Sequence, residues 1–198
     1  IQAQDNQGLI QYDPPMGINH PYKYIVGFTQ PPLYINELVA INQDTLNDEA
    51  GESGDWFEIY NAESQPIELS GMYLTDAIEN TTKWQIPEGV SVPGEGRVIF
   101  WADNEPDEGP THVNFKLDGD GERLALYASE ANYNGLIDEI YYGPQRVDQP
   151  FGRYPDGAET WRLLSPTPGQ ANRQPPPRIV SLDQIPPFPK PDQSATIH

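Results

Sequence analysis

The acidic segment at residues 42–55, with the sequence NQDTLNDEAGESGD, holds the densest group of candidate metal ligands in the chain. Asp44, Asp48, Glu52 and Asp55 are carboxylates, which are hard oxygen ligands of the kind that calcium prefers. Two glycines in the segment allow the tight turns that such sites need. The spacing does not fit an EF-hand loop, and a solvated acidic loop at the end of a domain explains the same residues. We expect any bound calcium to use these four carboxylates together with backbone carbonyls.

A second, weaker calcium candidate is the pair Asp118 and Asp120 in the sequence DGDG. Alternating Asp and Gly between two strand patterns is also typical of a hairpin turn, which accounts for both residues without a metal.

Nucleophilic catalysis finds little support in the residue types. The chain has no cysteine, and its three histidines are His20, His112 and His198. No paired-histidine metal motif and no glycine-rich phosphate loop is present in the sequence. Only His112 lies among the strand patterns, and we interpret it as a hydrogen-bonded structural residue rather than a general base.

Two glutamates, Glu37 and Glu58, fall on predicted strands that could be neighbours. A pair of carboxylates can act as acid and base in glycoside hydrolysis. A surface position, or a role in bracing a turn, explains the pair more simply. We therefore predict no catalytic site and no enzymatic activity.

Aromatic residues raise the alternative of a carbohydrate-binding surface, because sugar rings stack on exposed aromatic side chains. The outward-facing candidates are Trp56, Tyr60, Tyr141, Tyr142 and Trp161. The same residues could instead cover the edge of a sheet. We predict that Trp84 and Trp101 pack in the core.

Charge restricts the classes of partner. The formal net charge is -19, which repels phosphate backbones and anionic lipid and disfavours binding to nucleic acid or to a membrane surface. The sequence has no apolar run long enough for membrane insertion.

The strand patterns predict an all-β fold, an immunoglobulin-like antiparallel β-sandwich. In DWFEIYN, Phe57 and Ile59 face one way, while Trp56, Glu58 and Tyr60 face the other, which is typical of a strand with one buried face. Residues 98–101 are apolar on both faces and predict a central strand. The predicted core is Ile35, Leu38, Phe57, Ile59, Leu69, Leu74, Trp84, Ile99, Trp101, Leu124, Leu126, Ile137 and Ile140.

The order of these motifs resembles the lamin tail domain family, and most closely its bacterial branch. The motifs are LYINELVAIN, DWFEIYN, IELSGMYLTD, TTKWQIPEGVSVPGEGRVIFWAD, HVNFKLDGDGERLALY, LIDEIYYG, FGRYPDG and LSPTPGQAN. The resemblance implies an immunoglobulin-like sandwich that is used as a module and is not known as an enzyme. Similar bacterial domains occur in long exported or surface proteins.

Composition divides the chain into three parts. Residues 33–172 hold the motifs, residues 1–32 form an N-terminal flank with a strand-like patch at 22–28, and residues 173–198 form a proline-rich linker with another strand-like patch at 178–182. We expect the N-terminal patch to add to a sheet edge. We also expect an extracellular or cell-surface multidomain parent whose neighbouring domains are partners.

Two functions remain open. The first is a non-catalytic interaction or spacer module with a protein or polysaccharide partner. The second is a carbohydrate-recognising accessory domain of an enzyme whose catalytic domain lies outside this chain.

Overall fold

The computed structural model describes residues 2–4, 10–12 and 28–177, and over these residues it is built almost entirely from β-strands. The only helical element in the described part is a short 3-10 turn, η1 (Glu130–Asn132). Every pairing between the strands is antiparallel, as the alternating patterns predict. The predicted all-β sandwich is therefore confirmed.

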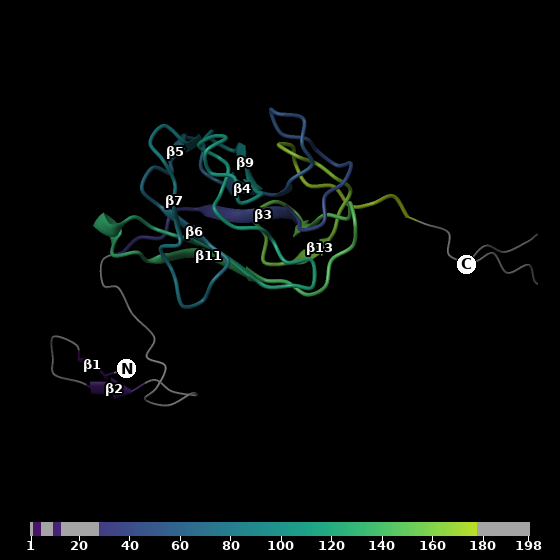
Figure 1. Ribbon diagram of the computed structural model, residues 1–198. Coiled ribbons are helices and arrows are strands. Elements are labelled where there is room, and N and C mark those ends of the chain that lie inside the picture. Colours follow the sequence, from purple (N-terminus) through teal and green to yellow (C-terminus); the bar gives the residue numbers. More distant parts are fainter. Residues whose placement is uncertain (1, 5–9, 13–27, 178–198) are drawn as a thin grey trace, which may run out of the picture.

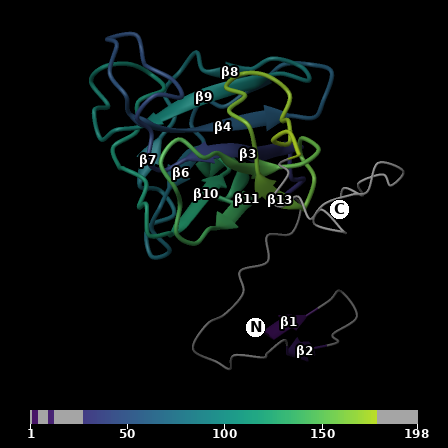
Figure 2. The same ribbon diagram turned by 90° about the vertical axis from the view of Figure 1, so that its right-hand side faces the viewer.

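Two sheets form the layers of the sandwich, as Figures 1 and 2 show. In spatial order, the five-stranded sheet contains β13 (Trp161–Leu163), β12 (Phe151–Arg153), β3 (Leu33–Val39), β4 (Asp55–Asn61) and β9 (Arg97–Ala102). The four-stranded sheet contains β11 (Leu136–Tyr141), β10 (Arg123–Tyr127), β6 (Tyr73–Thr75) and β7 (Trp84–Gln85). Two small pairs complete the strands, β5 (Ile67–Glu68) with β8 (Ser91–Val92), and β1 (Gln2–Gln4) with β2 (Ile10–Tyr12).

The main hydrophobic core lies between the two sheets. Phe57 from β4 stacks on Phe100 from β9, with ring centroids 5.5 Å apart, and both side chains are fully buried. Leu126 from β10 is fully buried on the opposite sheet. All the predicted core residues are buried except Ile99 and Ile140, which are half-buried. The alternation of apolar residues therefore identified the inner faces correctly except in β9, where Ile99 and Trp101 lie on the outer face.

The outer face of the five-stranded sheet is also buried, which the alternation did not predict. Trp56 and Glu58 have no exposed surface, and Tyr60 is half-buried. The interpretation of these three as solvent-facing residues is wrong because two loops cover the outer face. A second, small apolar cluster of Val39, Trp56 and Trp101 forms beneath one of them.

The strand at residues 98–101 is not central. Among the described strands, β9 is the last of its sheet and forms its ladder with β4, and one isolated bridge joins its Trp101 to His112. Its apolar outer side is covered in part by the loop at residues 42–50 instead of by another strand. A run that is apolar on both faces shows that both faces are covered, but it does not distinguish a neighbouring strand from a loop.

The packed unit extends beyond both predicted limits. Phe28 packs against the core, and the Gln30 side-chain amide donates to the Ile137 carbonyl. At the other end, Ser165 pairs with Arg173 through an isolated bridge. The remainder of the predicted patch at 22–28, and all of the patch at 178–182, lie outside the described residues.

The segment at 118–121 forms a turn but not a hairpin. The Gly121 N–H donates to the Asp118 carbonyl at 3.0 Å, and Gly121 has a φ of +104°, which favours glycine. The segment before it, HVNFKL, bridges to Trp101 of β9 and to Asp103 just after this strand, whereas β10 after it joins the other sheet. The turn therefore carries the chain from one layer to the other.

Candidate functional site

The outer face of the five-stranded sheet carries most of the residues that could do chemistry. Two loops cover it, the acidic loop at residues 42–50 and the loop at residues 165–172. Thr45 and Leu46 from the acidic loop lie over Trp56, whose indole N–H donates to the Thr45 hydroxyl at 2.9 Å. The second loop carries the motif SPTPGQAN and reaches the carboxylates of β3 and β4.

Glu37 and Glu58 are direct cross-strand neighbours, as predicted, and neither has any exposed surface. The Thr167 N–H and hydroxyl donate to the two Glu37 oxygens at 3.1 and 2.7 Å. The Gly169 N–H donates to Glu58 at 3.0 Å. A surface role for the pair is wrong, and the two carboxylates brace the loop at 165–172 against the sheet.

Arg97 and Asp156 extend this buried network. The Arg97 guanidinium contacts the Asp156 carboxylate, and its Nε lies 3.5 Å from a Glu58 oxygen. Asp156 also accepts from the Asn36 side chain at 2.9 Å and from the Asn172 N–H at 3.0 Å. Every carboxylate of the network therefore has donors from neighbouring segments.

Burial raises the pKa of both strand glutamates. For Glu58 burial is the largest cause and the nearby charge of Glu37 adds to it, and together they outweigh the hydrogen bonds and raise its pKa to about 8. For Glu37 burial outweighs the hydrogen bonds from Thr167 and raises its pKa to about 7. Both groups therefore hold protons more strongly in the folded protein than in the unfolded chain.

This difference predicts a pH dependence of stability. Below pH 4.5, the ordinary pKa of glutamate, Glu58 is protonated in both states. As the pH rises from there through about 8, the unfolded chain releases the proton first, so the stabilisation is lost with rising pH. We expect the unfolding free energy of the protein, relative to that of Glu58→Gln, to fall by at least ~1 kcal/mol between pH 5 and pH 8.5. Denaturant titrations across this range measure it.

Glu88→Gln is the matched control because Glu88 is exposed in a turn outside the network. Its stability relative to the unchanged protein should be independent of pH over the same range. A Glu58→Gln difference that stays constant, or that grows with pH, would show instead that Glu58 is ionised in the folded protein.

His112 matches its predicted structural role. Its side chain is buried, and Nδ1 lies 2.6 Å from an Asp103 oxygen. Burial opposes the protonation of His112, but the hydrogen bond and charge of Asp103, with a smaller contribution from Glu49, outweigh it and raise its pKa above the ordinary value. Asp103 also accepts from the Glu105 N–H, so this pair fixes the loop that follows β9.

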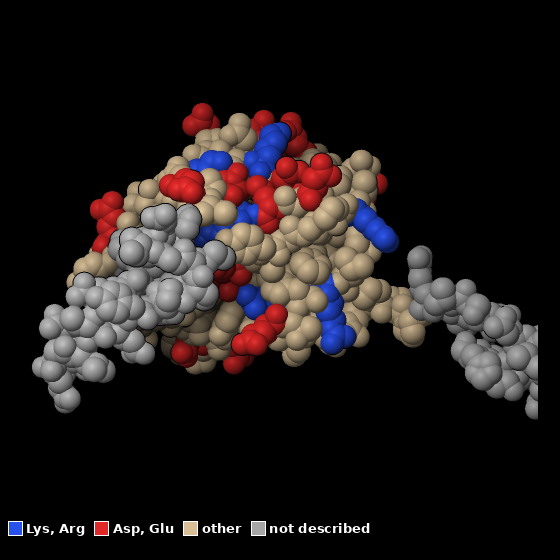
Figure 3. Space-filling view, turned by 90° about the horizontal axis from the view of Figure 1, so that it is seen from below, with Lys and Arg blue, Asp and Glu red and all other residues tan. Residues whose placement is uncertain are grey.

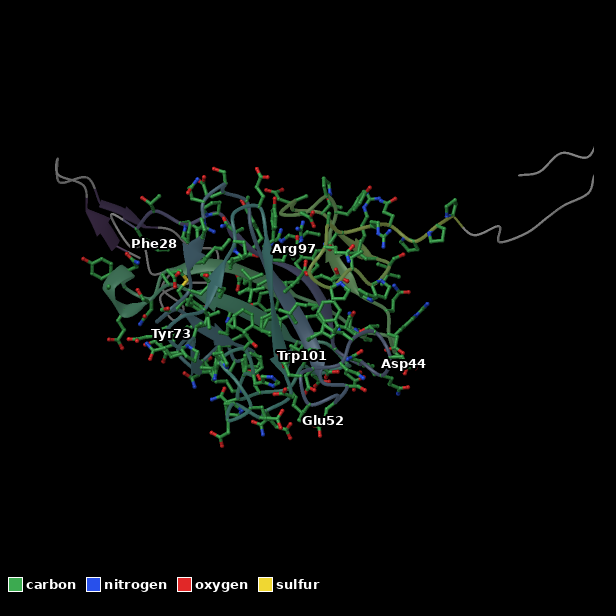
Figure 4. All side chains as sticks on the ribbon, turned by 90° about the horizontal axis from the view of Figure 1, so that it is seen from above. Phe28, Asp44, Glu52, Tyr73, Arg97 and Trp101 are labelled. Atoms are coloured by element: carbon green, nitrogen blue, oxygen red, sulfur yellow. The ribbon has the colours of Figure 1, made fainter. Side chains whose placement is uncertain are left out.

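The four predicted calcium ligands do not come together as one set. Asp48 accepts from the N–H groups of Ala50 and Glu52 at 2.9 and 2.8 Å, so it organises its own loop. Asp55 accepts from the Asn42 N–H at 3.0 Å. Asp44 lies apart from Glu52 in Figure 4, and its backbone N–H is bound by Asp148 at 2.9 Å.

Two of the four carboxylates, Asp48 and Glu52, instead lie close to side chains of the loop that follows β9. Two groups of candidate ligands have their ligand atoms within 4.8 Å of one another, and their members are Asp48, Asp103, Glu108 and His112 in one, and Glu52, Glu105 and Glu108 in the other. Only the second group is made of oxygen ligands alone, which is what calcium requires. The alternative pair, Asp118 and Asp120, is part of a turn in which Asp118 accepts from the Asp120 N–H.

Calcium binding stays a prediction, now with a changed ligand set. We expect calcium at 10 to 100 times its Kd to stabilise the fold by ~1.4–2.7 kcal/mol, because it relieves repulsion among the carboxylates. Melting curves in calcium and in chelator measure the effect. Glu108→Gln should abolish it, whereas Asp44→Asn, outside both groups, should not. A midpoint that calcium leaves unchanged supports a solvated acidic loop.

The five aromatic candidates of the carbohydrate-binding alternative do not form a platform. Trp56 and Tyr142 are buried, and Trp161 packs against Phe151 with ring centroids 5.2 Å apart. Tyr60 lies under the Arg97 guanidinium at 4.6 Å. Of the five candidates only Tyr141 is exposed, and one ring does not form a stacking surface for a sugar chain.

A groove of about 500 Å³ lies on the outer face beside β9. Ile99 and Trp101 line it from the strand, Leu46 and Glu49 from the acidic loop, and Gly169 from the other covering loop. Figure 4 shows Arg97 and Trp101 toward opposite ends of this strand. The groove is therefore apolar along β9 and acidic on the side of the loop at 46–49.

Sequence reasoning missed Arg97, Asp103, Asp156 and Glu108. A signal for Arg97 was available, because a charged residue begins an otherwise apolar strand pattern and needs a partner if the strand is buried. The other three lie in connecting loops rich in acidic residues, where the sequence does not single out any one of them.

Comparison with known proteins agrees with this architecture. None of the curated proteins matches the chain significantly. Within the described ranges, the structure has no helix with the length and apolar character needed to cross a bilayer. The family model of the Lamin Tail Domain matches residues 28–144, and Phe28 at the start of this range packs against the core. Its members are non-catalytic immunoglobulin-like domains. The chain belongs to the lamin tail domain family.

Proposed function

We propose that this domain is a non-catalytic interaction module of a larger exported or cell-surface protein, and that its partner is a protein. The observation that carries the proposal is the contrast on the outer face of the five-stranded sheet. Its buried carboxylates are fully used in bracing the loop at 165–172, while the groove beside β9 stays open. The buried carboxylates are hydrogen-bonded within the domain, and the open groove gives a partner an apolar and acidic surface to bind.

The carbohydrate-binding alternative receives less support from the same face. Trp56 and Tyr142 are buried, so the aromatic surface that would stack on sugars is missing from the five candidates. The one aromatic side chain that lines the groove, Trp101, is only 4% exposed, and the rest of the lining is aliphatic, polar or charged.

Nucleic acid is disfavoured as a partner by the net charge of -19. On the face in view in Figure 3, basic side chains stand singly among acidic ones and form no continuous basic area. A gel-shift assay at low salt, where electrostatic attraction is strongest, should detect no binding to DNA or RNA. Tight binding under these conditions would contradict this part of the proposal.

The proposal is tested by offering the immobilised chain two kinds of ligand. One is a phage library of random twelve-residue peptides, and the other is a glycan array. Enrichment of a shared peptide pattern with no glycan signal is the expected result. Specific glycan binding without peptide enrichment would overturn the proposal in favour of the carbohydrate-binding alternative.

A further inference from the structure

We propose that the free edge of β9 binds an extended peptide segment in which apolar and basic side chains alternate along one face of the strand. The proposal rests on the proposed function as a protein-binding module and names the surface and the chemistry of the partner. The peptide would add a strand beside Arg97–Ile99, place an apolar side chain in the groove and place a basic one against Asp48 and Glu49.

The backbone N–H and C=O groups of β9 point toward β4 at one residue and away from it at the next. In the antiparallel ladder with β4, the Asn61 N–H donates to the Gly96 carbonyl at 3.0 Å, so the pairs two residues further along are also hydrogen-bonded. The residues between them, Arg97, Ile99 and Trp101, direct their N–H and C=O groups away from β4. Trp101 shows this directly, because its N–H donates outward to another segment of the chain.

Only one end of the free edge of β9 is occupied by the described residues. The Trp101 N–H donates to the Thr111 carbonyl at 2.9 Å, and the Val113 N–H donates to the Trp101 carbonyl at 2.9 Å. Across the part of the chain that the structure describes, no strand pairs with β9 at Ile99 or Arg97 on this side. Unpaired groups on an edge strand are a template for an added strand, and such addition is a common mode of peptide recognition.

The groove next to this edge is open and is apolar along β9. Ile99 and Trp101 lie on the same side of the strand as Arg97, facing outward, and Leu46 packs with them. The groove volume of about 500 Å³ is in the range that ligand pockets have. An added strand places alternate side chains on the same face, so one of its apolar side chains would enter the groove.

The groove is negatively charged on the side of the acidic loop. Asp48 and Glu49 line the loop side of the groove. Arg97 does not offset them, because its guanidinium is held by Asp156 and Glu58 and its side chain is only 9% exposed. A basic side chain two residues from the apolar one would lie on the same face and meet these carboxylates, and the net charge of -19 would speed its approach.

The test uses the full chain and three synthetic eight-residue peptides. The first has valine and lysine in turn at every second position with threonine between them, the second has glutamate in place of lysine, and the third is the first with methylated backbone amides on the edge that would face β9. Fluorescence anisotropy measures their affinities. We expect the valine–lysine peptide to bind at least tenfold more tightly than either of the others.

Two variants locate the binding. Ile99→Pro removes an outward N–H and the groove side chain while leaving the bonds to β4 intact, because proline is tolerated at such edge positions. Glu49→Lys reverses a charge on a side chain that is 81% exposed. Each variant should bind the valine–lysine peptide at least tenfold more weakly than the unchanged protein does. Glu88→Lys, an exposed change outside the groove lining, should not. Melting curves show that each variant folds.

Several outcomes would overturn this inference. If the valine–lysine peptide binds the unchanged protein and both folded groove variants equally, the groove is not its binding site, although the proposed protein-binding function stands. If none of the three peptides binds at millimolar concentration, β9 does not accept a strand of this chemistry. A concentration-dependent dimer that Ile99→Pro abolishes would show that a second copy of the chain is the occupant instead.

Discussion

Replacing Leu126 with alanine is expected to lower the free energy of unfolding by ~2–5 kcal/mol. Leu126 is fully buried in β10, where it lies between Leu74 of β6 and Asp138 of β11 in the sheet register. Its side chain points into the core between the two sheets. Truncation removes buried methyl groups and leaves a cavity that the rigid strands on both sides cannot close. Urea unfolding followed by fluorescence measures the change.

Leu163→Ala is the matched control, since Leu163 lies on β13 with 48% of its surface exposed. It should change the stability by no more than ~0.5 kcal/mol. A loss this small for Leu126→Ala would mean that β10 turns its other face to the core, because a shift of one residue exchanges the two faces of a strand.

Replacing Arg153 with alanine is expected to cost ~3–5 kcal/mol, because it removes the cation paired with the largely buried Asp138 carboxylate and a donor to the Ile35 carbonyl. Arg153 lies on β12 and joins the two sheets. Its guanidinium donates to both Asp138 oxygens at 2.8 and 2.9 Å, and its Nε donates to the Ile35 carbonyl at 2.9 Å. The side chain also stacks on Trp161, 5.1 Å from the ring centroid. Thermal and urea unfolding measure the loss.

Two further variants separate charge from geometry at this position. Arg153→Lys keeps the charge but cannot reach the Asp138 oxygens and the Ile35 carbonyl together, so it should lose most of the same stability. Arg162→Ala, an exposed arginine on the neighbouring strand β13, should lose no more than ~0.5 kcal/mol. If Arg153→Lys were as stable as the unchanged protein, the charge alone would matter and the hydrogen-bonded fork would not.

The sequence by itself determined the fold class and the inner faces of the sandwich. In β4, Phe57 and Ile59 alternate with the residues between them, and both are fully buried. In β10, Leu124 and Leu126 do the same. This information is local, because a strand with a period of two carries the pattern of its own faces whatever its neighbours are. The order of the motifs likewise identified the family before any strand was placed.

The tertiary structure decided which strand lies at the edge and what covers the outer face. The pattern of β9 is apolar on both sides, but nothing local shows that its outer side is covered by a loop from residues 42–50. Glu58 fits a solvent-facing position in the alternation, yet it is buried by a loop that follows more than one hundred residues later. Contacts at such sequence separation are set by how the sheets stack, which the period of a strand does not encode.

The same physical reason separates the predicted calcium ligands from the observed groups. The sequence identified an acidic loop, and Asp48 and Glu52 do take part in clusters of candidate ligands. Their partners, Asp103, Glu105 and Glu108, come from the loop after β9, which pairing between β4 and β9 brings alongside. Composition therefore determined that this end of the domain is acidic, and only the register of Asp55 against Ala102 decided which carboxylates meet there.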